Sequence, residues 1–134
     1  CSSDLTSLAD FSGAKVTAQL NTFHYSVIDQ IPGVEKQAAM DNFPAMRVAL
    51  QAGTIDAYVS ELPEAISAQA ANSDFVMVKL TDGFKVSPED IQTAVGVKKD
   101  SPLTKQINEA LKTISSEERQ KIMEEAIKNQ PAAE

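Results

Sequence analysis

Two kinds of segment alternate along the chain. In one kind, apolar residues recur at every second position, which is typical of strands, and in the other they recur every three to four positions, which is typical of helices. Five segments are rich in β-branched or apolar residues and are predicted as strands. They are KVTAQ (15–19), the weaker VEKQAAM (34–40), IDAYVSE (55–61), FVMVKL (75–80) and IQTAVGVKK (91–99).

Helical patterns fill most of the chain between and after these strands. Pro32-Gly33 ends the first helix, Gly53 closes the second, and Ser115 with Glu118 predicts a capping box for the last. Residues 5–13 are predicted as a short helix or turn, and residues 81–90 as a loop or hairpin. The predicted helices cover 22–31, 43–53, 63–72, 101–114 and the segment after Ser115.

Strands that alternate with helices predict an α/β fold with a doubly wound, mostly parallel sheet. A flavodoxin-like order 2-1-3-4, followed by a return strand, puts a crevice at the carboxyl ends of the first and third strands, where such folds bind ligands. We expect residues 5–90 to form a ligand-binding lobe. Residues 91–134 are expected to supply the return strand and C-terminal helices.

The residues at that crevice are small, polar or aromatic. Asn21 and Thr22 join the first strand to a helix, and a helix N-terminus and a hydroxyl both suit a carboxylate. Glu61 ends the third strand and suits an ammonium group. Caps and acidic residues at strand ends are also common structural features. The candidate ligand-binding residues are Gln19, Asn21, Thr22, Phe23, Ser60 and Glu61.

Charge and composition limit the classes of function that this chain can have. The net charge of −7 argues against nucleic acid as a partner. One cysteine and one histidine exclude a Cys/His metal cluster, and neither a phosphate-binding glycine loop nor a nucleophile elbow is present, so no cofactor and no catalytic residue is expected. His24, beside the crevice, is read either as an ordinary helix residue or as part of a ligand rim.

Three segments carry a resemblance to a known family. SLADFSGAKVTAQLNTFHYSVI, FPAMRVALQAGTIDAYVSELPEAI and TAVGVKKDSPLTKQINEALKTI occur in this order within residues 5–129. The sequence resembles the polar amino acid ABC-transporter substrate-binding proteins, which are two-lobed periplasmic binding proteins of type II. The resemblance covers the second lobe and the C-terminal segment.

The resemblance implies a role for each candidate residue. A Gly-Thr pair of the family binds the ligand α-carboxylate, and Asn21-Thr22 stands in its place. The acid that closes the third strand binds the α-ammonium group, which implies Glu61. Gln19 and Ser60 would face the ligand side chain and, being neutral, suggest a glutamine-like ligand. Asn21 and Glu61 depart from the family's Gly and Asp, which leaves the choice of amino acid open.

The resemblance also implies a setting. The chain would deliver its ligand to the membrane permease of an importer, outside the cytoplasm. Cys1 is either a lipoprotein cysteine or a boundary of processing. The family's first lobe, with its carboxylate-clamping arginine, is not part of this sequence, so exposed C-terminal helices are expected to favour a dimer or a domain swap. The alternatives are a lobe that binds nothing by itself and, less favoured, a signalling or enzymatic α/β domain.

Overall fold

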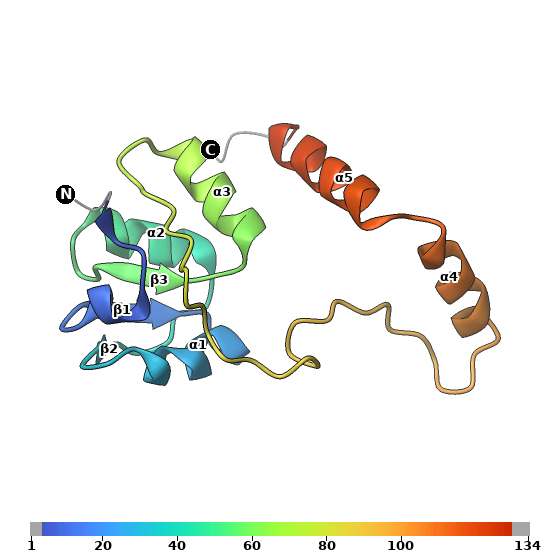
Figure 1. Ribbon diagram of the computed structural model, residues 1–134, viewed down its shortest axis with the longest axis horizontal. Helices are drawn as coiled ribbons and strands as arrows, with labels where there is room; N and C mark the ends of the chain where they lie inside the picture. Colours follow the sequence, from blue (N-terminus) through green and yellow to red (C-terminus); the bar gives the residue numbers. More distant parts are fainter. Residues whose placement is uncertain (1–3, 130–134) are drawn as a thin grey trace. The chain divides into compact units, whose positions relative to one another are not determined.

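The computed structural model describes residues 4–129 (Figure 1). Cys1, interpreted as either a lipoprotein cysteine or a boundary of processing, lies outside this range. The chain divides into two compact units, unit 1 (Cys1–Ile91) and unit 2 (Gln92–Glu134). The helices and strands of unit 1 are η2 (Leu8–Phe11), β1 (Lys15–Ala18), α1 (Phe23–Val27), η3 (Ile28–Gln30), β2 (Glu35–Lys36), α2 (Phe43–Gln51), β3 (Ala57–Val59) and α3 (Leu62–Ala71). Those of unit 2 are α4 (Leu103–Lys112) and α5 (Ser116–Lys128).

A small parallel sheet organises unit 1. Its strands have the order β2-β1-β3, with Val16 of β1 opposite Lys36 on one side and Ala57 on the other (Figure 1). The α/β class is confirmed, and these three strands have the predicted relative order. β2 is shorter than predicted, and the parallel pairing resumes only at a single bridge between Gln19 and Met40.

β1 is covered on both faces, as expected for the central strand of a parallel sheet. Val16, Thr17 and Ala18 are buried in succession. The apolar members pack with Ile28 and Ile31 in the core of the unit. Thr17 satisfies its buried hydroxyl by donating a hydrogen bond to the carbonyl oxygen of Ala38 at 2.8 Å.

Two predicted strands are wrong. Residues 75–80 and 91–99 are in neither a strand nor a helix, so the predicted fourth strand and return strand are not formed. A strand forms only where a neighbouring strand pairs with its backbone by hydrogen bonds, and β-propensity alone does not supply that neighbour. In 91–99 the apolar side chains that would define a buried face are exposed, including Ile91 at 63% and Val95 at 57%.

Unit 2 consists of a connecting segment followed by α4 and α5. Both helices occur where the sequence predicts them. Ser115 caps α5: its hydroxyl accepts a hydrogen bond from the backbone N–H of Glu118, while the Glu118 carboxylate accepts one from the backbone N–H of Ser115. The predicted capping box is therefore confirmed. Neither helix contains a buried residue.

Candidate functional site

The loop after β1 turns sharply into α1. Asn21 has φ of +62°, a left-handed conformation that glycine adopts freely and asparagine tolerates better than most residues. This geometry is compatible with the expectation that Asn21 stands at a position where glycine is common. Gln19, at the start of the turn, donates its side-chain amide to the carbonyl oxygen of Asp41 at 3.1 Å. Its amide is thus directed towards the segment after β2.

Thr22 and Phe23 lie at the start of α1. Thr22 occupies the N-cap position, but its hydroxyl makes no cap bond to the helix. The hydroxyl instead donates to the carbonyl oxygen of Gln19 at 2.7 Å. It closes the turn, so it would have to rotate before donating to a ligand. Phe23 stacks at a tilt on the ring of His24, with ring centroids 4.1 Å apart.

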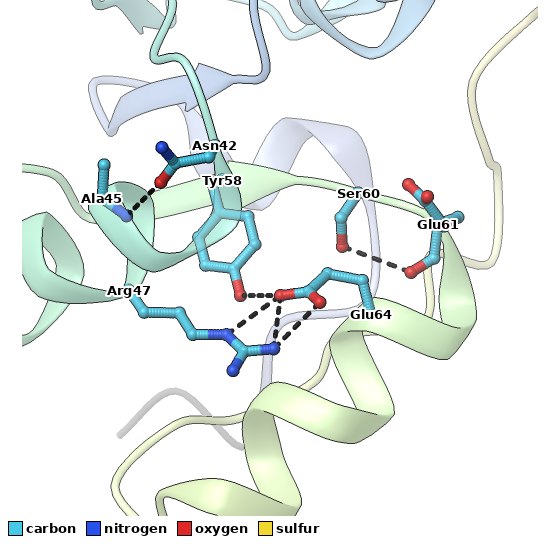
Figure 2. Close-up of polar contacts among 7 residues, drawn as sticks. All are labelled: Asn42, Ala45, Arg47, Tyr58, Ser60, Glu61 and Glu64. Atoms are coloured by element: carbon cyan, nitrogen blue, oxygen red, sulfur yellow. Dashed lines mark hydrogen bonds and ion pairs between the residues drawn. The ribbon is translucent and has the colours of Figure 1, made fainter. Parts of the chain in front are cut away.

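The loop after β3 presents Ser60 and Glu61. Glu61 is the N-cap residue of α3, and its side chain makes no cap bond to that helix. About half of that side chain is exposed, at 52%. The Ser60 hydroxyl is 3.3 Å from the Glu61 carbonyl oxygen, to which it donates a weak hydrogen bond (Figure 2). The Glu61 carboxylate is therefore not used to stabilise its own helix.

His24 links the two loops. Its Nε2 lies 3.5 Å from Oε2 of Glu61, which shows that the segments after β1 and after β3 meet at one edge of the sheet. Burial lowers the pKa of His24, and the nearby Glu61 carboxylate opposes part of that effect. The imidazole is thus mostly neutral at pH 7. The sequence predicts His24 beside the crevice but not among the candidate ligand-binding residues. The available signal was its position in the first turn after Thr22.

A second polar cluster fixes the start of α3. Arg47 of α2 makes two hydrogen bonds from one nitrogen to the Glu64 carboxylate, at 2.8 and 2.9 Å, and a third from Nε at 3.0 Å. The Tyr58 hydroxyl donates to the same carboxylate at 3.3 Å (Figure 2). Burial, followed by the Glu64 charge, raises the pKa of Tyr58. Figure 2 shows Glu61 apart from this cluster, one turn earlier along the chain.

The ion pair of this cluster is largely buried. The Arg47 and Glu64 side chains are only 22% and 13% exposed. Because the pair joins α2 to the first turn of α3, it holds the end of β3 in place. The consequence for the site is indirect: the cluster determines where Ser60 and Glu61 lie.

Within residues 4–129, no three His, Cys, Asp or Glu side chains are grouped so that they could hold a metal ion. In the same range, no helix has both the length and the apolar character needed to cross a membrane. The polar groups of the candidate site are the Glu61 carboxylate, the His24 imidazole, two hydroxyls and two amides. The hydroxyls belong to Thr22 and Ser60, and the amides to Gln19 and Asn21.

Comparisons with protein families, with curated proteins and with solved structures give no match to this chain.

Proposed function

We propose that this protein is the substrate-binding component of an ABC importer, and that unit 1 is one lobe of a two-lobed periplasmic-binding-protein fold. One observation carries the proposal. The loops after β1 and β3 converge, because His24 of the segment after β1 lies 3.5 Å from the exposed Glu61 carboxylate after β3, and Asn21-Thr22 and Glu61 therefore border the same edge of the sheet. A hydroxyl opposite a carboxylate suits the two charged groups of an α-amino acid.

The roles follow from the chemistry of each residue and from the resemblance. Glu61 binds the ligand ammonium group, because its carboxylate is exposed and free of any cap bond. Thr22 binds the ligand carboxylate after its hydroxyl turns from the Gln19 carbonyl oxygen. Gln19, Phe23 and Ser60 border the space for a polar, glutamine-like side chain. The ligand is then handed to permease subunits at the outer side of a membrane.

An amide NMR titration of the 134-residue chain with a panel of amino acids tests this function. We expect localised shifts at Asn21, Thr22 and Glu61. Because a single lobe makes only part of the contacts, the dissociation constant should be roughly millimolar, or about 4 kcal/mol. Glu61→Ala should abolish the shifts.

Glu89→Ala is the matched control, since Glu89 is an exposed glutamate of the loop at 81–90. It should leave the titration unchanged. Shifts that persist in Glu61→Ala would contradict the assignment of the ammonium site. No response to any amino acid would favour the alternative, a lobe that binds nothing by itself.

A further inference from the structure

We propose that His24 is a further residue of the ammonium site and competes with the ligand for the Glu61 carboxylate. This inference rests on the proposed function. It starts from the contact between the two side chains, 3.5 Å from Nε2 to Oε2. In the ligand-free protein, the imidazole occupies one of the directions from which an ammonium group would approach that carboxylate.

The surroundings of His24 keep the ring in this place. Its side chain is 15% exposed, compared with 52% for Glu61, and Phe23 stacks against it. The imidazole is therefore the fixed partner, and the carboxylate is the one that faces solvent. In the described part of the chain, Glu61 is the charged group whose field acts on His24.

The protonation state of His24 decides how strongly its imidazole competes with the ligand ammonium group for the Glu61 carboxylate. A neutral imidazole leaves the charge of Glu61 uncompensated, so that an ammonium group is attracted. A protonated imidazole neutralises the carboxylate and repels the ammonium group. Burial lowers the pKa of His24, so the neutral, binding-competent form prevails at pH 7. Affinity should therefore fall as the solution is acidified. By reciprocity, ligand binding should lower the pKa of His24 further.

The test is a titration with L-glutamine at about pH 7.5 and about pH 5.5, on either side of the ordinary histidine pKa of about 6.5. We expect binding by the wild-type chain to be about twofold weaker at the lower pH, because the lowered pKa leaves the His24 imidazole only partly protonated there and the Glu61 carboxylate is half-exposed. In His24→Gln the ratio of the two affinities should be close to one, whatever their absolute values.

A ligand-free measurement accompanies this test. The chain has a single histidine, so its ring protons titrate without overlap in NMR. Replacing Glu61 by Gln removes the opposing charge and should lower the pKa of His24. An unchanged pKa of His24 would show that the pair with Glu61 does not form in solution. That result would overturn the proposed role of His24 but leave the proposed function standing.

The two failures are distinguishable. Equal wild-type affinity at both pH values would overturn the role of His24 and leave the proposed function standing. No binding of glutamine or of any other amino acid at either pH would overturn both. A pH dependence that persists in His24→Gln would assign the effect to another group and reject His24.

Discussion

In unit 1, the central strand β1 buries Val16, Thr17 and Ala18 in succession, whereas in unit 2 neither α4 nor α5 buries any residue. The two units contain helices of similar length, so the difference lies in what stabilises them. Unit 1 depends on tertiary packing around a sheet. Unit 2 depends on local signals, such as its capping box and the exposed Lys112–Glu109 pair.

The difference bears on function, because a ligand site requires side chains held in fixed positions. The loops that carry Thr22 and Glu61 belong to unit 1, where the core and the Arg47–Glu64 pair hold them. Unit 2 exposes large apolar side chains on its helices, including Leu103 and Ile122. We expect unit 2 to respond only weakly to substitutions that strongly destabilise unit 1.

The largest effect is expected from Ile28→Ala. Ile28 is fully buried, so the lost contacts and the resulting cavity should reduce the free energy of unfolding by about 2–5 kcal/mol. Urea denaturation followed by tyrosine fluorescence measures this. Both tyrosines, Tyr25 and Tyr58, lie in unit 1, and the chain has no tryptophan.

Ile122→Ala is the matched control, since Ile122 in α5 is 58% exposed. It should change the same free energy by less than about 0.5 kcal/mol. Equal losses from the two substitutions would remove the contrast between the units.

The next effect concerns ion pairs. Glu64→Gln leaves Arg47 without its charged partner at a site where both side chains are largely buried. We expect a loss of about 1–3 kcal/mol in the stability of unit 1, because hydrogen bonds to charged groups are among the strongest. Denaturation monitored by tyrosine fluorescence again provides the measurement.

Glu109→Gln provides the comparison for an exposed pair. Glu109 and its partner Lys112 are 61% and 72% exposed, and such pairs contribute little. No measurable change is expected. A Glu64→Gln protein as stable as the wild type would show that the Arg47 cluster does not hold the start of α3.

A smaller effect is expected in unit 2 itself. Ser115→Ala removes the hydroxyl of the capping box and should cost α5 about 1 kcal/mol of helix stability. Amide hydrogen exchange along α5 would detect this loss. The midpoint of urea denaturation of unit 1, followed by tyrosine fluorescence, should stay unchanged. Ser116→Ala, one residue further along, is the control and should leave exchange in α5 nearly unaltered.

The pH dependence of this cap gives an independent check. Hydrogen bonds from the Ser115 backbone N–H and hydroxyl lower the pKa of Glu118. A lowered pKa in the folded state means that the cap contributes above the ordinary glutamate pKa and is lost as the pH falls through the lowered value. The protection factor of amides in the first turn of α5, which corrects the exchange rate for its intrinsic pH dependence, should therefore fall on acidification in the wild type. If the protection factor falls equally in Ser115→Ala, the cap is not the cause.

Local signals in the sequence predicted some parts of the structure well and others poorly. The capping box at Ser115, the turn at Gly53 and the three parallel strands follow from caps, glycine conformation and apolar spacing. The strands over 75–80 and 91–99 were wrong because pairing depends on a neighbour that local propensity does not reveal.

The candidate site shows the same limit. Strand order alone predicted that the ends of β1 and β3 would meet, and the contact between His24 and Glu61 is consistent with this. The side-chain directions were not predictable. The Thr22 hydroxyl donates a hydrogen bond within its own turn, and the Gln19 amide donates one to the segment after β2. Both side chains take these directions because backbone carbonyl groups lie within reach.

The last comparison concerns two residues with the same backbone conformation. Asn21 in unit 1 and Asp100 in unit 2 both have φ of +62°. Asn21→Ala should destabilise unit 1 by about 1 kcal/mol, because alanine adopts this conformation less readily than asparagine. Asn21→Gly should change stability by less than about 0.5 kcal/mol, since the relief of strain is offset by the freedom that glycine gains in the unfolded chain.

Asp100→Ala is the control, because it creates the same backbone strain in unit 2. The midpoint of urea denaturation of unit 1, followed by tyrosine fluorescence, should therefore not move. A denaturation midpoint lowered equally by Asp100→Ala and Asn21→Ala would mean that the two units unfold together, and would remove the contrast between them.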